Sequence, residues 1–277
     1  MLTEQGCCLC GLCVGMCGQI SAYQDQIAVT GGCKRQGGFC QTLCPKITPD
    51  AGREHATILT YRYDSGQRQL KSLLQTIARH LLSSPDDKLV AAISTEDALT
   101  PMSTTLDNDS DIEGLRFTHP CRSPTLASVF SLLKSNSTIH LIGTPCEALA
   151  LKGERRKYGP ISAKLGLTVS VACDVILDRN QLLRWMREMG VSRPIKNARY
   201  QGGEWSFKDA KDKHICLDYQ QAKNMAFPSC VACEFDSQYC EDIKIRRITP
   251  YEYEVSGRTD AGASFLSRNH HSLGLSV

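Results

Sequence analysis

The clearest hydrophobic pattern in the chain lies between residues 70 and 82, where apolar side chains recur at steps of three and four. This spacing places them on one face of an amphipathic helix. The residues that form the face are Leu70, Leu73, Leu74, Ile77, Ala78, Leu81 and Leu82. On either side, residues 57–63 and 88–95 are rich in aliphatic or aromatic side chains and are predicted to be strands.

The same alternation of strands and helices continues further along the chain. Residues 138–142 and 165–173 are predicted strands, and helices are expected over 123–133, 147–157 and 178–190. Strands that alternate with helices favour an α/β fold. We therefore expect a mixed sheet with flanking helices.

Two segments lack such a pattern. Residues 98–114 contain Pro101 and several Asn, Asp and Ser residues, which predicts a surface loop. Residues 267–277 are rich in Ser, Asn, His and Gly and are expected to form a loose tail. The main domain is accordingly placed over residues 55–266.

Residues 1–50 have a different composition, with few aliphatic side chains and many Cys and Gly. Such a segment cannot build an apolar core of its own, so a bound metal has to supply free energy for folding. The whole chain holds 15 cysteines, an odd number. Closely spaced thiols in a reducing compartment indicate metal ligands rather than a disulfide framework. We therefore predict a small ferredoxin-like, cluster-binding module in front of the main domain.

Four cysteines of this module follow the spacing C-x2-C-x2-C-x3-C of bacterial ferredoxins, namely Cys7, Cys10, Cys13 and Cys17. A second run consists of Cys33, Cys40 and Cys44. In two-cluster ferredoxins the fourth cysteine of each run binds the cluster of the other run. One [4Fe–4S] cluster is therefore predicted on Cys7, Cys10, Cys13 and Cys44. The second set, Cys17, Cys33 and Cys40, has one ligand fewer, so a [3Fe–4S] cluster, a non-cysteine ligand or no second cluster are all open.

Another group of cysteines lies in the main domain. Cys146 and Cys173 each follow or end a predicted strand, and the carboxyl ends of sheet strands are where α/β folds bind ligands. Cys230 and Cys233 form a C-x2-C pair, which suits half of a zinc site or half of an iron–sulfur site. The spacing alone is compatible with four thiols on one centre, with structural zinc and with buried thiols.

Composition narrows the class of protein. Hydrophobic residues make up 42% and charged residues 22% of the chain, an ordinary globular balance. The net charge of +3 gives no reason to expect nucleic-acid binding. No segment reaches the roughly 20 continuous apolar residues of a membrane span. The apolar stretch near residues 9–16 lacks the basic region and cleavage site of a signal peptide. We expect a cytoplasmic protein without a transmembrane segment.

Four motifs follow one another in the main domain: Gly143-Thr-Pro-Cys146, Cys173 behind a strand, Cys230-x-x-Cys233, and Arg258-Thr-Asp-Ala-Gly262. In this order they resemble the coenzyme F420 hydrogenase/dehydrogenase beta-subunit family. The resemblance covers residues 60–266, and an N-terminal ferredoxin module is a common attachment in that family.

The resemblance implies a [4Fe–4S] cluster on the main-domain cysteines Cys146, Cys173, Cys230 and Cys233. It also implies an FAD beside that cluster, and in many members coenzyme F420 as the hydride partner. The cofactor-binding residues that it implies are Arg258, Thr259, Asp260 and Gly262. A flavin exchanges a hydride for single electrons, so one-electron carriers are needed close to it. Two or three [4Fe–4S] clusters are expected in total.

Two redox functions are compatible with these features. The first is an iron–sulfur, flavin-dependent oxidoreductase subunit that relays electrons between a hydride carrier such as F420 and a partner redox enzyme. The second is a non-catalytic electron-transfer subunit of a hydrogenase, formate dehydrogenase or similar hetero-oligomeric complex that has lost its flavin. Ser65-Gly66-Gln67 favours the second, since family members usually have a glycine pair there. A zinc-stabilised interaction module is disfavoured, because C-x2-C-x2-C-x3-C is typical of cubane clusters.

Overall fold

The structure is a computed structural model of the 277-residue chain. It describes residues 7–23, 26–31, 44, 58–64, 70–107, 112–113, 115, 119–133, 135–157, 163–173, 175–201, 203–231 and 241–277. The predicted ligands Cys33, Cys40 and Cys233 lie outside these residues, as do the segment 65–67 and the expected domain boundary between residues 50 and 55.

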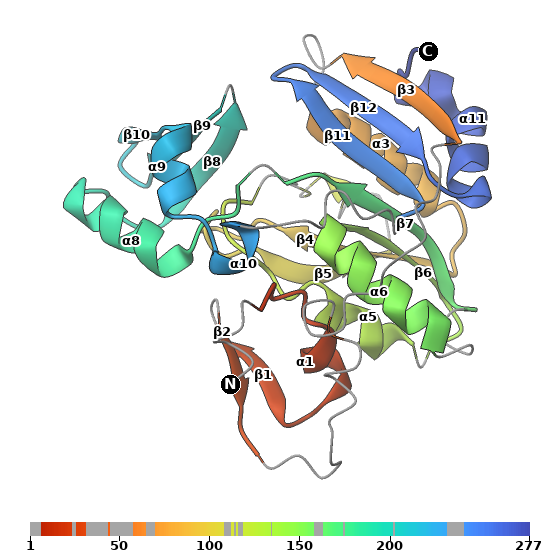
Figure 1. The fold of residues 1–277 in the computed structure, drawn as a ribbon, viewed down its shortest axis with the longest axis horizontal. Coiled ribbons are helices and arrows are strands. Elements are labelled where there is room, and N and C mark those ends of the chain that lie inside the picture. The colour runs from red at the N-terminus through yellow and green to blue at the C-terminus, as the bar shows by residue number, and fades with distance from the viewer. Residues whose placement is uncertain are drawn as a thin grey trace.

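A seven-stranded mixed sheet forms the centre of the molecule, in the order β3-β12-β11-β7-β6-β4-β5 (Figure 1). Its four middle strands are parallel, and the outer strands pair antiparallel. The strands are β3 (Leu59–Asp64), β4 (Asp87–Ile93), β5 (Met102–Leu106), β6 (Thr138–Gly143), β7 (Leu165–Val171), β11 (Ile243–Thr249) and β12 (Glu252–Gly257). The carboxyl ends of β4, β6, β7 and β11 therefore meet at one edge of the sheet.

Helices cover both faces of this sheet. Successive side chains of β4 point to opposite faces of the sheet. Leu89 and Ala91 pack with one pair of helices, and Val90, between them, packs with the other pair. The first pair is α3 (Leu70–Leu81) and α11 (Asp260–Leu273), and the second is α5 (Leu126–Leu132) and α6 (Pro145–Lys157). The predicted mixed sheet with flanking helices is confirmed. No helix in the described part of the chain is both long and apolar enough to cross a membrane.

The amphipathic face predicted around residues 70–82 is buried as expected, with Leu73, Leu74, Ile77, Ala78 and Leu81 inside α3. The other predicted strands and helices of the main domain also form, with boundaries that move by a few residues. The helix expected from residue 123 begins at Leu126.

Two predictions about loops are wrong. The segment 98–114, expected as a surface loop, contains β5, which pairs antiparallel with β4 and buries Leu106. The expected loose tail, 267–277, begins with the second half of α11. Leu273 and Leu275 are buried against the core, and Ser276 pairs with β3 through Arg62. The few apolar residues among Ser, Asn and His are enough to fasten the end of the chain, so the domain extends beyond residue 266.

Residues 178–225 form a small unit between β7 and β11, which we call the inserted unit. It contains the three-stranded antiparallel sheet β8 (Ile195–Gln201), β9 (Glu204–Asp209) and β10 (His214–Leu217), with α8 (Arg179–Glu188) and α9 (Tyr219–Asn224). Trp205, Phe207 and Leu182 lie in its apolar core. In Figure 1 it stands beside the large sheet, and a β-bridge between Leu177 and Ala226 closes its base.

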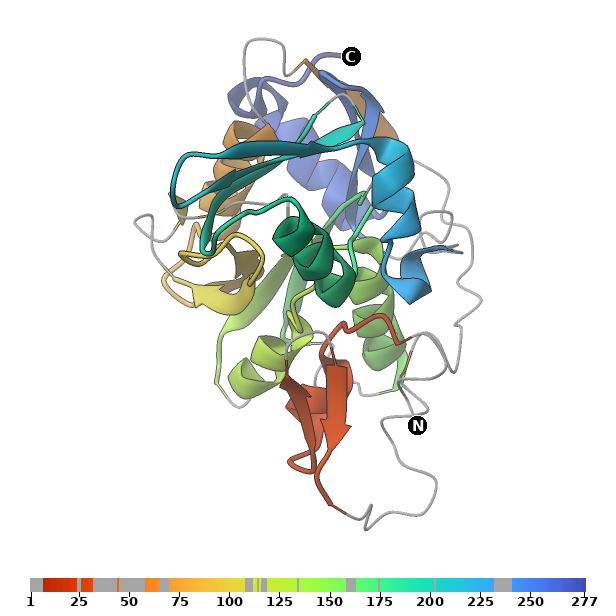
Figure 2. The same ribbon diagram turned by 90° about the vertical axis from the view of Figure 1, so that its left-hand side faces the viewer.

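The described part of the N-terminal segment contains the short helix α1 (Leu12–Met16) and the hairpin of β1 (Ile20–Tyr23) and β2 (Gln26–Val29). Figures 1 and 2 both place it beside α5 and below α6. Leu12 is buried in the same apolar cluster as residues of these two helices. The N-terminal segment therefore packs into the apolar core of the main domain. A ferredoxin-like fold for residues 1–50 stays a prediction.

Candidate functional site

The turn between β6 and α6 carries the first of the predicted main-domain ligands. Pro145 takes the first helical position and Cys146 the second. The Glu147 carboxylate accepts a hydrogen bond from the Thr144 backbone N–H at 2.7 Å, as in a capping box. A Cβ on Gly143 would lie 2.5 Å from a Glu147 carboxylate oxygen, so a larger residue here would push the carboxylate away from its place beside Thr144. The G-T-P-C-E sequence thus fixes the buried Cys146 at the carboxyl edge of the sheet.

Cys173 and Cys230 reach the same edge from two other segments. Cys173 follows β7, and Cys230 lies in the short helix α10 (Pro228–Val231). The Phe227 N–H donates to the Ile176 carbonyl at 2.7 Å, which holds the two segments together. Both thiols pack against the apolar cluster that contains Phe227 and Ile176.

Arg122 joins two of these thiols. Its Nη1 donates to Cys146 Sγ at 3.1 Å, and its Nη2 donates to Cys230 Sγ at 3.3 Å. The residue is 6% exposed. Burial lowers the pKa of Arg122, but the neighbouring thiols of Cys146, Cys230 and Cys173 raise it, and the pKa ends well above its ordinary value. A permanent cation therefore lies among the sulfur atoms.

The N-terminal cysteine run is attached directly to this site. The Leu126 N–H, at the start of α5, donates to the Cys10 carbonyl at 2.9 Å. Gly11 has a φ of 86°, and a Cβ there would overlap the carbonyl oxygen of Pro124. Glycine at this position therefore permits the close approach of the two backbones.

Cys8 links the N-terminal run to the main-domain thiols. Its side chain is buried and hydrogen-bonds with the thiols of Cys10 and Cys146. The bond with Cys10, together with burial, raises the pKa of Cys8 well above its ordinary value. The bond with Cys8, followed by burial, does the same to the pKa of Cys146.

The ligands predicted for the N-terminal clusters are partly described. Cys7 and Cys44 lie close enough for their charges to interact, and so do Cys10 and Cys13. One apolar cluster, around Leu9, is bordered by thiols of both cysteine groups, namely Cys7, Cys13, Cys17, Cys173 and Cys230. Because Cys33 and Cys40 lie outside the described residues, the division of these ligands between two clusters stays a prediction.

The donor set suits an iron–sulfur cluster in its chemistry, since it consists of thiols alone. Cys146 and Cys230 lie within hydrogen-bond distance of one guanidinium, and Cys173 is near enough to act on its charge. The fourth predicted ligand, Cys233, is outside the described residues. Among the residues that are described, no three His, Cys, Asp or Glu side chains are already grouped as a metal site.

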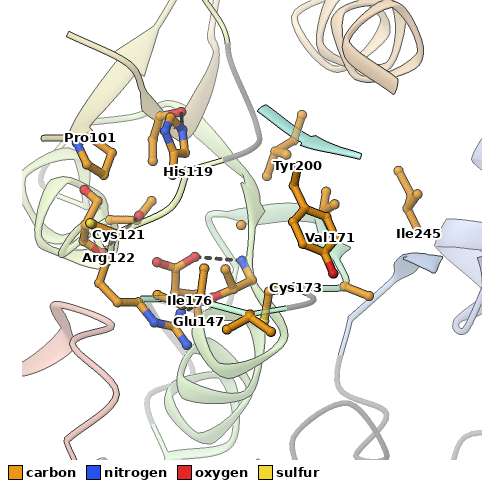
Figure 3. Close-up of a pocket in the computed structure, with 18 of the residues that line it drawn as sticks. Pro101, His119, Cys121, Arg122, Glu147, Val171, Cys173, Ile176, Tyr200 and Ile245 are labelled. Atoms are coloured by element: carbon orange, nitrogen blue, oxygen red, sulfur yellow. Dashed lines mark hydrogen bonds between the residues drawn. The ribbon is translucent and has the colours of Figure 1, made fainter. Parts of the chain in front are cut away.

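A pocket opens at the same edge of the sheet, with Arg122 and Glu147 next to each other on one side and Tyr200 on another (Figure 3). Its cavity volume of about 90 Å³ is below the rough 300–1,000 Å³ of cofactor sites, so a coenzyme could enter only if the walls moved apart. The Arg247 guanidinium lies 5.0 Å from the centre of the Tyr200 ring and 5.6 Å from that of Tyr253. Aromatic rings and a cation suit a planar, negatively charged ligand.

The motif Arg258–Gly262 lies at the opposite edge of the sheet, because β12 runs antiparallel to β11 and ends at the amino edge of the parallel strands. Thr259 Oγ1 donates to Asp242 Oδ1 at 2.9 Å and accepts from the Gly262 N–H at 3.1 Å, which caps α11. A Cβ on Gly262 would overlap the Asp242 carbonyl. The predicted cofactor-binding residues Arg258, Thr259, Asp260 and Gly262 do not line the pocket. Their role in cofactor binding stays a prediction.

Several residues of the site are not singled out by the sequence. Arg122 follows a cysteine in an irregular segment, and nothing in that segment predicts that its guanidinium is buried. Tyr200 belongs to the inserted unit, for which the sequence gives no strand prediction. Glu147 becomes recognisable only as the third helical residue after Thr144, a spacing that does predict a capping interaction.

Comparison with known proteins adds two findings. Residues 136–270, which contain Cys146, Cys173 and Cys230, match the family model for the C terminus of the coenzyme F420 hydrogenase/dehydrogenase beta subunit. Among solved structures, the fold resembles a chain of the F420-reducing [NiFe] hydrogenase complex from Methanosarcina barkeri, with a TM-score of 0.64 and 15% identity. The match covers 78% of this chain and 80% of that chain, and at this identity it concerns the fold. No curated protein matches the sequence.

Proposed function

Residues 136–270 belong to the coenzyme F420 hydrogenase/dehydrogenase beta-subunit family, and from this premise we propose that the chain is an iron–sulfur electron-transfer subunit of a larger redox complex. Bound [4Fe–4S] clusters would supply one-electron transfer at neutral pH. The residues proposed to hold the main-domain cluster are Cys146, Cys173, Cys230 and Cys233. The N-terminal run would hold one or two more.

The observation that carries this proposal is the meeting of two distant thiols at one buried cation. Cys146 and Cys230 come from α6 and α10, yet both accept hydrogen bonds from Arg122. Thiols that only fill an apolar core need no desolvated guanidinium between them. Thiolate ligands carry negative charge, and a buried cation compensates it.

Other residues of the chain support the same role by their position. Leu9, Ile176 and Phe227 form an apolar cluster against the thiols and cover part of their surface. The Cys8 thiol contacts both Cys10 and Cys146, so a predicted ligand of the N-terminal group and one of the main-domain group are separated by a single side chain. A short separation of this kind suits a chain of one-electron carriers.

We propose further that the pocket receives a hydride carrier such as coenzyme F420 or FAD. Arg122 and Cys173 line the pocket, so a ligand held there would lie next to the proposed cluster. Tyr200 offers a ring for stacking, and Arg247 offers a cation for an acidic group of the ligand.

A second candidate is a conduit that has lost its flavin and transfers single electrons only. The observation that favours it is the position of the Arg258–Gly262 motif, which packs α11 against Asp242 and does not line the pocket. In this alternative the chain passes electrons between other subunits, and the pocket has no coenzyme.

Partner subunits are expected in both candidates. The structural relative is described as part of a hydrogenase complex. We propose that this chain likewise works with other redox subunits in a hetero-oligomeric assembly, with a hydrogenase, formate dehydrogenase or similar enzyme as the electron partner.

Anaerobic preparation of the whole chain tests the proposal. About twelve irons and twelve acid-labile sulfides per chain would agree with three clusters, and about eight with two, at four of each per [4Fe–4S] cluster. Zinc without sulfide would exclude the iron–sulfur function. Cys146→Ser is expected to lose one cluster's worth of iron, whereas Cys216→Ser, an exposed thiol on β10, serves as the matched control.

The two candidates are separated by the cofactor released on acid treatment. A flavin spectrum, or reduction of the clusters by reduced coenzyme F420, would support the hydride-exchanging subunit. Cluster content without flavin and without reduction by any hydride carrier would support the conduit.

A further inference from the structure

We propose that Arg122 is a positioning residue that clamps Cys146 and Cys230 around the main-domain cluster and raises the reduction potential of that cluster. The inference rests on the proposed function, because it requires these cysteines to be ligands. According to this inference, a side chain that is not itself a cluster ligand raises the reduction potential of one cluster.

The clamp follows from the shape of the guanidinium. Its nitrogens lie in one plane at fixed positions, so two bonds from it fix two acceptors relative to each other. Nη1 bonds to Cys146 and Nη2 to Cys230, at 3.1 and 3.3 Å. One rigid group therefore sets the separation of a sulfur on α6 from a sulfur on α10.

Thr144 strengthens the hold on one of these sulfurs. Its hydroxyl accepts a second hydrogen bond from Arg122 Nη1 at 3.1 Å and lies 3.1 Å from Cys146 Sγ. The Cys146 sulfur is therefore contacted by two groups, the Thr144 hydroxyl and the Arg122 guanidinium. Ligand sulfurs held by outer hydrogen bonds in this manner keep their orientation, which is how surrounding residues tune a metal site.

The burial of Arg122 shows that its charge is directed at sulfur. The guanidinium hydrogen bonds within the described part of the chain go to Cys146, Cys230 and Thr144. Nε is buried and has no hydrogen-bond partner among the described residues. Leaving a buried N–H unsatisfied costs free energy, so packing alone does not explain an arginine here. The hydrogen bonds from its two Nη atoms explain why an arginine is found here.

The direction of the effect on the potential follows from charge. Each ligand thiolate is negative, and uptake of one electron at the site adds one more negative charge. A fixed cation at hydrogen-bond distance from two ligand sulfurs stabilises the more negative state more strongly. Glu147 is the opposing charge nearby and acts on both Arg122 and Cys146, but burial raises the pKa of its carboxyl group, and the carboxylate accepts from the Thr144 N–H while the guanidinium bonds directly to the sulfurs. The net effect is a higher reduction potential.

The test is an anaerobic redox titration of the whole chain with dithionite, followed by electron paramagnetic resonance, with iron and sulfide measured for each variant. Arg122→Gln is expected to shift the midpoint potential of one cluster to a lower value and to leave the other clusters unchanged. Arg122→Lys keeps the charge but cannot reach both sulfurs at once. Its midpoint potential is therefore expected to lie between those of the wild-type protein and Arg122→Gln. Arg193→Gln, which removes a cation that bonds to Asp97, is the matched control without effect.

Wild-type iron content with an unchanged midpoint for every cluster in Arg122→Gln would overturn the inference. If Arg122→Gln does not fold, the midpoint potential and iron content of Arg122→Lys provide the test. A lower midpoint, or loss of one cluster from a folded chain, supports the clamp, and a wild-type midpoint overturns it. Failure of the proposed function is distinguishable, because the wild-type chain itself would then contain no iron and no acid-labile sulfide.

Discussion

The Leu126 N–H donates to the Cys10 carbonyl at 2.9 Å, which ties the first cysteine run to the start of α5 in the main domain. A tethered module would make no such bond. Together with the burial of Leu12 under α5 and α6, this contact makes the N-terminal segment part of the packed body. The distance between the two groups of cysteines is therefore set by the fold instead of by a linker.

Gly11 is the residue on which this attachment depends. Gly11→Ala would place a methyl group against the Pro124 carbonyl and force a non-glycine residue to adopt a φ of 86°. We expect the substitution to lower the free energy of unfolding by about 1–3 kcal/mol. Urea unfolding of the anaerobic protein measures this. Gly18→Ala, where nothing lies within 4 Å of the added Cβ, is the control, and equal losses in both variants would contradict the attachment.

Thr259 is expected to stabilise the main domain at the amino edge of the sheet. Thr259→Val removes the hydroxyl that caps α11 and bonds to Asp242, and we expect a loss of about 1–2 kcal/mol in the free energy of unfolding. Thr259→Ser keeps the hydroxyl and should restore most of the stability. A Thr259→Val protein as stable as wild type would show that the cap contributes nothing.

His140 is expected to make the folded state sensitive to acid. Its Nδ1 accepts from the Leu167 N–H at 3.0 Å, and its Nε2 lies 3.6 Å from Asp87. Burial lowers the pKa of His140, against a smaller raising effect of Asp87. The unfolded chain takes up this proton near about pH 6.5. Between that pH and the lower folded pKa, the unfolded state binds more protons, so stability falls as the pH falls.

The variant that tests this is His140→Gln, which has no group that titrates in this range. We expect the wild-type protein to lose more stability than His140→Gln between about pH 6.5 and pH 5, and the two curves to run parallel above about pH 7. Urea unfolding at a series of pH values measures the difference. Parallel curves over the whole range would exclude His140 as the source.

Arg247 is expected to recognise the ligand of the pocket. Arg247→Met keeps the apolar stem and removes the cation, and binding of an acidic flavin or deazaflavin coenzyme should weaken by roughly 10-fold or more, as for loss of one charged hydrogen bond. Fluorescence titration with coenzyme F420 and with FAD measures the affinity. The matched control is Arg246→Met, whose exposed side chain pairs with Glu254 at 3.2 Å on the neighbouring strand. Equal weakening in both variants would argue for a general charge effect.

Much of the central fold could be predicted from the sequence, because local patterns specify it. The face of α3 follows from the spacing of its leucines, and Cys146 and Cys173 reach one edge because both follow parallel strands. The C-terminal helix was not predictable in the same way. Only a few apolar residues, such as Phe265 and Leu273, hold α11, and the polar residues between them conceal the pattern.

The missing parts of the site depend on contacts between distant segments. Arg122 is charged and stands outside any helix or strand, so only the folded chain reveals that it lies between Cys146 and Cys230. Tyr200 and Arg247 approach each other from the inserted unit and from β11, which share no local signal. The Arg258–Gly262 motif is visible in sequence, but its side-chain bonds to Asp242 follow only from the reversal of β12.

The inserted unit has a narrow base along the chain, although its apolar core also contains Ala98, Leu99 and Cys121 of the main domain. Because the chain leaves and returns at the paired residues Leu177 and Ala226, Cys173 and Cys230 stay neighbours whatever the length of the excursion between them. Tyr200 and Trp205, however, belong to that excursion and form a wall of the pocket. Tyr200→Ala should therefore weaken coenzyme binding at the proposed pocket while iron content stays unchanged. Sequence changes within this excursion would alter which ligand the pocket accepts without moving the cysteines.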